Sequence, residues 1–130
     1  MQRTIIAALL LLFGVASCAS QPPPSGNALY AANCASCHGR YADGAGPAST
    51  DIVIPDLRYL AADNGGVFPR TEVLNVIDGR KPVNAHFTRQ MPIWGDTFAG
   101  MEGSNKSSEA HVRAKIDALV DYLAAIQQRR

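Results

Sequence analysis

The sequence predicts an all-α fold, because apolar residues recur at helical spacing and no stretch alternates apolar and polar residues as a half-buried strand would. The strongest helical pattern lies in residues 108–128, with Ser107 or Ser108 as the predicted N-cap. One face of that segment carries Val112, Ile116, Leu119, Leu123 and Ile126. The chain has 130 residues, and the 113 that follow the leader predicted below suffice for one small domain.

Residues 1–17 have the pattern of a secretory signal peptide. Arg3 supplies the positive charge, and the nine residues from Ile5 to Phe13 form an apolar run. This run is about half as long as a membrane-spanning helix. The segment ends in Val-Ala-Ser before Cys18, which resembles the lipobox of bacterial lipoproteins. The resemblance implies cleavage before Cys18 and acylation of that residue.

The lipobox resemblance predicts a protein that is lipid-anchored on the periplasmic side of a bacterial membrane. Residues 18–25 would then be the lipidated cysteine and a tether that three consecutive prolines stiffen. Ala19 stands where an aspartate would imply retention in the inner membrane, which favours the outer membrane. The alternative is ordinary cleavage near Ala19, which predicts a soluble periplasmic protein.

The chain without its leader is nearly neutral. After removal of Arg3, 11 Lys and Arg residues balance 11 Asp and Glu residues. Recognition of a nucleic acid would require a basic face. We therefore expect no nucleic acid partner.

Residues 34–38 carry the most specific motif of the chain, Cys-Ala-Ser-Cys-His. In an exported protein, two cysteines at this spacing followed at once by histidine are the attachment site of a c-type haem. Cys34 and Cys37 would each bond one vinyl group of the porphyrin, and His38 would bind the iron. A zinc site needs about four ligands and a redox dithiol a βαβ pattern, and the sequence offers neither. With Cys18 acylated, no thiol is left for a disulfide.

The motif is expected at the end of a helix. Residues 27–37 are rich in alanine, a strong helix former, and Gly39 is predicted to end the helix. Residues 40–70 show little periodicity apart from a short helix predicted at 56–62. Such a long irregular stretch is unusual in a compact domain, and a large apolar haem explains it.

A further helix is predicted at residues 71–77, with Thr71 as N-cap and Gly79 at its end. Residues 81–105, rich in proline, glycine and aromatic residues, are expected to form a loop.

The haem iron has a second axial position, for which the chain offers several candidates. Met91 is preferred, because it lies in residues 90–95, an irregular aromatic stretch that would hold a ligand stiffly. His86 is the first alternative. His111 is expected at the surface, and Met101 precedes a polar turn and is a poor rival. Ligation by histidine and methionine raises the reduction potential, and a closed sixth position predicts an electron relay rather than a catalyst.

With these residues the chain resembles the class I monohaem cytochromes c, over most of residues 26–127. The family pairs its terminal helices through a glycine and an aromatic residue ahead of the first haem cysteine, and Gly26 and Tyr30 stand at these positions. Leu119 and Tyr122 match the residues that answer them in the last helix.

The resemblance extends to the haem site. Gly46 and Pro47 resemble the turn whose proline carbonyl accepts a hydrogen bond from the proximal imidazole, here that of His38. Met91 and the proline after it resemble the segment of the distal ligand. The resemblance implies a small cytochrome c fold over residues 26–130, with about three to five helices and long loops wrapped around one covalently bound haem c.

The function that follows is electron transfer by a membrane-anchored periplasmic monohaem cytochrome c, which shuttles single electrons between redox proteins and has no catalytic residues. The alternative is a haem c subunit of a dehydrogenase or terminal oxidase complex. A haem enzyme or gas sensor would need an open sixth position. The most basic stretch would pair with haem propionates or form a docking rim. It consists of Arg70, Arg80, Lys81 and Arg89.

Overall fold

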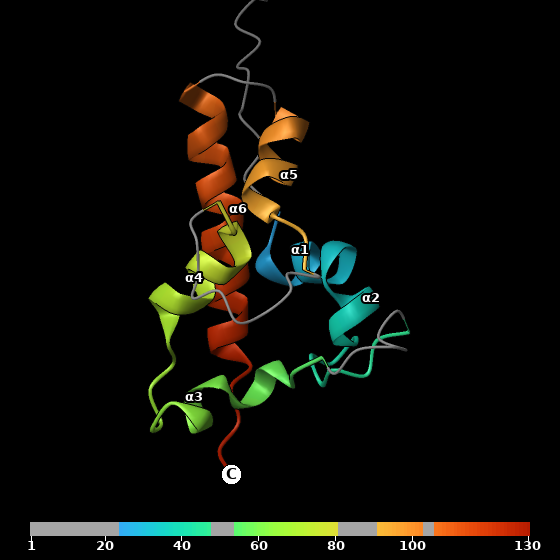
Figure 1. The fold of residues 1–130 in the computed structure, drawn as a ribbon, viewed down its shortest axis with the longest axis vertical. Helices are drawn as coiled ribbons and strands as arrows, with labels where there is room; N and C mark the ends of the chain where they lie inside the picture. Colours follow the sequence, from blue (N-terminus) through green and yellow to red (C-terminus); the bar gives the residue numbers. More distant parts are fainter. Residues whose placement is uncertain (1–23, 48–53, 81–90, 103–105) are drawn as a thin grey trace, which may run out of the picture.

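The computed structural model describes residues 24–47, 54–80, 91–102 and 106–130, and within these ranges it contains helices and no strand (Figure 1). The all-α prediction is confirmed. The helices in chain order are α1 (Gly26–Asn33), α2 (Ala35–His38), the 3₁₀-helix η2 (Leu57–Tyr59), α3 (Leu60–Asp63), α4 (Arg70–Asp78), α5 (Trp94–Glu102) and α6 (Lys106–Ala125). None of these helices combines the length and the apolar character that crossing a membrane requires.

Helix α6 is the long axis of the domain, and α1, α4 and α5 all pack against it (Figure 1). Its predicted apolar face is confirmed for Val112, Ile116, Leu119 and Leu123, which are all buried. The helix ends at Ala125 and not at residue 128, so Ile126, which is partly buried, lies just beyond it. Burial of side chains of this size stabilises the fold by roughly 1.5–3 kcal/mol each. The predicted cap is wrong: because the helix begins at Lys106, both candidate serines lie in its first turn.

The terminal helices meet as the resemblance implied. Gly26 approaches the backbone of α6 so closely that a Cβ there would overlap the carbonyl of Ala118. Four residues later, the buried ring of Tyr30 packs against that of Tyr122, with 5.2 Å between ring centroids. This contact places the end of α1, and with it the five-residue motif, beside the C-terminal half of α6.

The predicted helix at 27–37 is two helices. Helix α1 begins after Ser25, whose side chain accepts a hydrogen bond from the backbone N–H of Ala28 at 3.3 Å. Cys34 interrupts the helix with φ −115°, and α2 then carries the rest of the motif. Gly39 ends α2 with φ 80°, a region that favours glycine, as predicted.

Helix α4 agrees with its prediction except at its start. It begins at Arg70, with Pro69 in the cap position, so Thr71 lies inside the first turn and is not the N-cap. Its end is confirmed, because Gly79 adopts the left-handed conformation and donates its N–H to the carbonyl of Asn75 at 2.9 Å.

The prediction of a loop over residues 81–105 is wrong at Trp94–Glu102, which form helix α5. Two glycines weaken the helical signal of this stretch. Tertiary packing stabilises the helix instead. Phe98 is only 1% exposed, its ring lies 5.5 Å from that of Trp94, and the Lys115 ammonium of α6 lies 5.5 Å from the ring centre.

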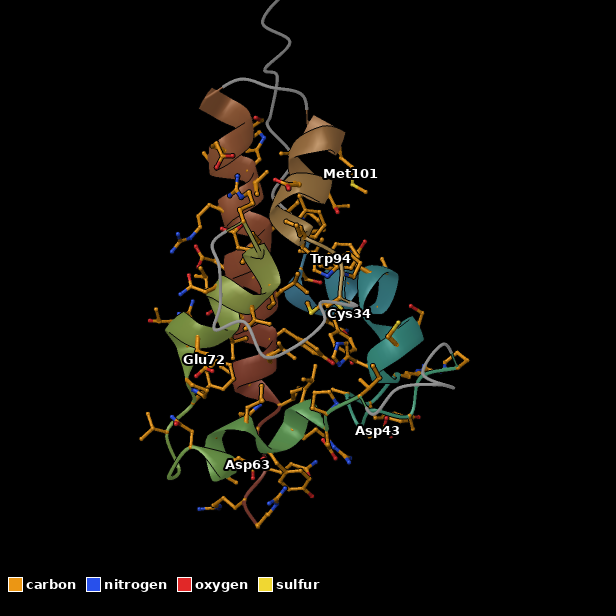
Figure 2. The ribbon with its side chains drawn as sticks, viewed as in Figure 1. Cys34, Asp43, Asp63, Glu72, Trp94 and Met101 are labelled. Atoms are coloured by element: carbon orange, nitrogen blue, oxygen red, sulfur yellow. The ribbon has the colours of Figure 1, made fainter. Side chains whose placement is uncertain are left out.

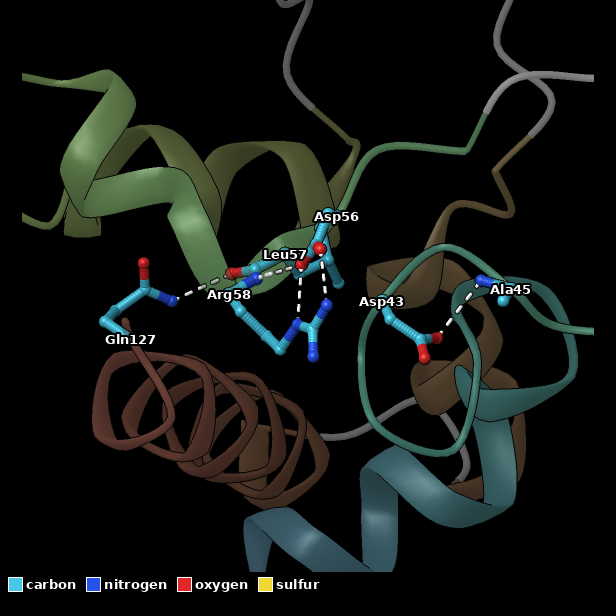
Figure 3. Close-up of polar contacts among 6 residues, drawn as sticks. All are labelled: Asp43, Ala45, Asp56, Leu57, Arg58 and Gln127. Carbon is cyan, nitrogen blue, oxygen red and sulfur yellow. Dashed lines mark hydrogen bonds and ion pairs between the residues drawn. The ribbon is translucent and has the colours of Figure 1, made fainter. Parts of the chain in front are cut away.

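The short helix predicted at 56–62 is confirmed as η2 followed by α3. Asp56 caps it and accepts two hydrogen bonds from the Arg58 guanidinium, at 2.9 and 2.7 Å (Figure 3). Gln127, beyond the end of α6, holds this segment from the other side. Its side chain donates to the carbonyl of Leu57 at 2.8 Å (Figure 3). It also accepts a hydrogen bond from the N–H of Ala61 at 2.8 Å.

Candidate cofactor site

A cavity of about 690 Å³ lies between the packed helices. This volume is within the range of small-molecule and cofactor sites, about 300–1,000 Å³. Helices α1, α2, α4 and α6, the segment around η2 and α3, and the start of α5 all contribute to its walls. Most of the lining is apolar, including Leu57, Leu60, Val73, Val76, Ile77, Leu119 and Leu123.

The four residues predicted to hold a haem line this one cavity. Cys34, Cys37 and His38 come from the break between α1 and α2 and from α2 itself, and Met91 comes from the chain just before α5. Met91 lies 53 residues after His38 in the sequence. Figure 2 shows Cys34 and Trp94 close to this interior region, with Glu72 on the α4 side.

The two cysteines of the motif are free thiols and half buried. Burial is the main cause that raises the pKa of Cys34 to about 11, with the neighbouring Cys37 adding to it. At neutral pH this group is therefore a thiol and not the thiolate that binds metal ions and attacks disulfides.

His38 has two properties expected of a metal ligand, a neutral ring and a buried nitrogen atom without a hydrogen-bond partner among the described residues. Burial lowers the pKa of its imidazole, so the ring is neutral at neutral pH, the form that binds metals. Its Nδ1 atom is buried and has no hydrogen-bond partner among the described residues. A buried polar atom without a partner is costly, and it fits a group that the site is built to receive.

The prediction that the Pro47 carbonyl faces His38 is not supported. Pro47 is exposed and does not line the cavity. The backbone group that forms a hydrogen bond with the His38 ring is that of Pro55, a residue that lines the cavity. This bond favours the protonated form of the imidazole. Since proline has no N–H, this group is the carbonyl oxygen. Sequence reasoning missed Pro55 because spacing after the motif does not distinguish two prolines eight residues apart.

Gly46, the other residue of the predicted turn, supports the motif in a different way. A Cβ on Gly46 would lie 2.5 Å from the carbonyl oxygens of Ser36 and Cys37. The loop can therefore lie directly against α2 only because residue 46 has no side chain. A hydrogen bond of 3.1 Å from the Ala45 N–H to the Asp43 carboxylate shapes the turn just before it (Figure 3).

Two of the rival distal ligands, Met101 and His111, do not line the cavity. Met101 is 67% exposed and projects from the side of α5 (Figure 2), and His111 is exposed on α6. His86 is outside the described residues. Over the described ranges, no three His, Cys, Asp or Glu residues are grouped so that they could hold a metal ion.

Two of the basic residues predicted to pair with haem propionates, Arg70 and Arg80, form ion pairs with carboxylates of the protein. Arg70 forms an ion pair with Asp121 at 2.6 Å, and Arg80 pairs with Asp78 and Glu109. Neither arginine lines the cavity. Lys81 and Arg89 are outside the described residues.

Among the described residues, the charged side chains at the cavity are two carboxylates, Asp63 and Glu72. Arg70 and Arg80 thus pair with carboxylates of the protein and do not line the cavity, while the alternative of a docking rim stays a prediction.

The sequence matches the family model of cytochrome C oxidase, cbb3-type, subunit III over residues 21–123. All the residues that line the cavity lie within this matched segment. No curated protein and no solved structure is significantly similar to the chain.

Proposed function

The chain belongs to the family of cytochrome C oxidase, cbb3-type, subunit III, and on this premise we propose that it is a His/Met-ligated monohaem cytochrome c that passes single electrons between redox proteins. Membership of this family implies a covalently bound haem c and a role in electron transfer. The bound haem supplies the one-electron chemistry, while the protein binds it, orients it and tunes its potential.

The proposal assigns four residues to the haem. Cys34 and Cys37 would form the thioether bonds, and His38 and Met91 would bind the iron. The observation that carries this assignment is that the four side chains, from two distant parts of the sequence, line one apolar cavity of suitable size. The neutral, partly buried imidazole of His38, with its buried Nδ1 atom, supports its role as the proximal ligand.

The chain's own residues give this site the character of a relay. The apolar side chains of α4 and α6 that line the cavity would shield the bound group from water. The Pro55 carbonyl forms a hydrogen bond with the His38 ring. A hydrogen bond of this kind orients a ligating imidazole and makes it a stronger electron donor to the metal. A methionine on the distal side leaves no open position for a substrate and raises the reduction potential.

We also propose that the protein is anchored by lipid at Cys18 on the periplasmic side of a bacterial membrane, with residues 1–17 removed. The support is the signal peptide pattern and the lipobox resemblance. These residues are outside the described ranges. Mass spectrometry of the N-terminal peptide from the native membrane would detect the acyl groups, and an unmodified peptide beginning after Cys18 would favour a soluble periplasmic protein.

A second candidate function is that of a haem c subunit in a larger oxidase complex. The family to which the chain belongs is named for a subunit of a terminal oxidase, which favours this candidate. Extraction in mild detergent separates the two functions. A free carrier elutes as a monomer, whereas a subunit elutes with its complex.

The axial ligation is tested by the absorption spectrum of the ferric protein. We expect the wild type to show the weak long-wavelength band of an iron–sulfur bond and the Met91→Ala variant to lack it. Met101→Ala is the matched control, since it removes an exposed methionine outside the cavity, and it should keep the band. A spectrum of Met91→Ala identical to that of the wild type would refute Met91 as ligand.

A further inference from the structure

Arg80 joins three helices through its guanidinium group. Its Nε lies 2.6 Å from Oδ1 of Asp78, at the end of α4, and its Nη1 lies 2.5 Å from Oε1 of Glu109, in the first turn of α6. We call Asp78, Arg80 and Glu109 the Arg80 clip. The side chains of Arg80 and Asp78 are 30% and 18% exposed, so the pair is partly shielded from water.

Helix α5 lies against the clip through Gly95. A Cβ on Gly95 would overlap the Asp78 carboxylate and the Nε of Arg80. The guanidinium and its partner therefore occupy the space that a side chain at position 95 would fill. Residues 80 and 95 are in contact although they are 15 positions apart in the sequence.

This contact bears on the distal side of the cavity, because Gly95 belongs to the first turn of α5. Trp94 begins the helix and Met91 lies three residues before it, and both side chains line the cavity. A contact that holds Gly95 in place therefore also restrains the backbone position of Met91, four residues earlier in the chain.

The geometry favours a specific role for arginine here. An isolated exposed ion pair contributes little, but the planar guanidinium binds two carboxylates at once from defined directions. These hydrogen bonds raise the pKa of Arg80 far above its ordinary value, so its charge is permanent.

We propose that Arg80 is a positioning residue for the distal iron ligand, because the Arg80 clip holds the first turn of α5 at the place where Met91 meets the haem. This inference rests on the proposed function, in which Met91 binds the iron. Weakening the clip raises the fraction of molecules in which Met91 has left the iron, while haem attachment at Cys34 and Cys37 stays unchanged.

Added imidazole measures that fraction, since it binds the iron only where Met91 has left. Its apparent affinity is the intrinsic affinity multiplied by the open fraction. We expect Arg80→Gln and Gly95→Ala to bind imidazole up to about 10-fold more tightly than the wild type, because the Asp78 contact is partly shielded while the Glu109 contact is exposed and contributes less. The measurement uses the full-length ferric protein with its haem, followed by loss of the long-wavelength band.

The chain provides a matched control for Gly95→Ala. Gly100 lies in the same helix, and a Cβ there would meet nothing within 4 Å. Gly100→Ala should therefore bind imidazole like the wild type. If Gly95→Ala acts by separating Asp78 from Arg80, the double variant Gly95→Ala/Arg80→Gln should bind imidazole no more tightly than the tighter-binding single variant, because both changes remove the contact between Asp78 and Arg80.

The outcomes separate this inference from the proposed function. A wild type without the iron–sulfur band would refute the Met91 ligation on which both depend. A wild type with the band, but with imidazole affinities unchanged in Arg80→Gln, would overturn the positioning role alone. A lowered melting temperature with unchanged imidazole affinity would likewise overturn it, since the clip would then be merely structural. Should Gly95→Ala fail to fold, Arg80→Gln and Glu109→Gln test the same contact without adding atoms.

Discussion

The buried hydroxyl of Tyr30 donates a hydrogen bond of 2.8 Å to the carbonyl of Gly39. Tyr30 stands four residues before Cys34, and Gly39 directly follows His38. The bond therefore spans the five-residue motif and ties its far end to α1. Because the Tyr30 ring also packs on Tyr122 of α6, one side chain connects the terminal helix pair to the motif that we propose attaches the haem.

Replacing Tyr30 with phenylalanine should remove this bond at a modest cost. The Gly39 carbonyl keeps a second partner, the N–H of Ala42 at 3.1 Å, so it is not left unpaired. We expect the free energy of unfolding to fall by about 1 kcal/mol, measured by chemical denaturation of the haem-bound protein. Tyr41→Phe is the control, since Tyr41 is 69% exposed, and it should change stability by less than about 0.5 kcal/mol. Equal effects of the two variants would contradict the role given to Tyr30.

The same hydroxyl predicts a pH dependence at alkaline pH. Burial is the main cause that raises the pKa of Tyr30 well above its ordinary value, so the folded state retains the phenolic proton when the unfolded state loses it. The contribution of Tyr30 is complete below the unfolded pKa of about 10 and is lost as the pH rises toward the folded value. Stability should thus fall above about pH 10, and more steeply in the wild type than in Tyr30→Phe. Parallel stability curves for the two proteins would show that Tyr30 does not titrate in this way.

The close approach of the terminal helices makes Gly26 a sensitive position. In Gly26→Ala the new Cβ would overlap the Ala118 carbonyl, and such overpacking costs about 1–3 kcal/mol. Gly100→Ala, which adds the same atom in open space within α5, should be neutral or slightly stabilising. Thermal unfolding of both variants checks this. A Gly26→Ala protein as stable as Gly100→Ala would mean that the terminal helices do not pack as closely as described.

Gln127 is expected to hold the cavity wall formed by η2 and α3. Besides its bonds to Leu57 and Ala61, its Nε2 donates to the carbonyl of Leu123 at 2.7 Å. Gln127→Ala should lower stability by about 1–3 kcal/mol and speed amide hydrogen exchange at Ala61, whose N–H loses its partner. In Gln128→Ala the exchange rate at Ala61 should not change, because the described contact of Gln128 to Arg58 comes from its backbone N–H. Unchanged exchange at Ala61 in Gln127→Ala would rule out the contact.

Features encoded over a few residues could be predicted from the sequence. The apolar face of α6 repeats every three or four residues, and the motif of Cys34 and His38 is contiguous, so both are visible without tertiary information. The glycines that end α2 and α4 were also predicted, because a left-handed conformation at a helix end favours that residue. Met91 was selected from its local surroundings, and the structure brings it to the cavity.

Other features depend on parts of the chain that lie far apart in the sequence. Helix α5 contains two glycines and is stable because Phe98 is buried against the rest of the fold, a contact that local propensity does not contain. Whether Pro47 or Pro55 faces His38 depends on the path of the intervening backbone. Arg80 looks like one charge among several until α6 brings Glu109 beside it, 29 positions later. The proposed haem-binding motif could thus be predicted because its residues are adjacent in the sequence. The contacts that hold the segment of Met91 in place could not, because they form only when the folded helices bring separate segments together.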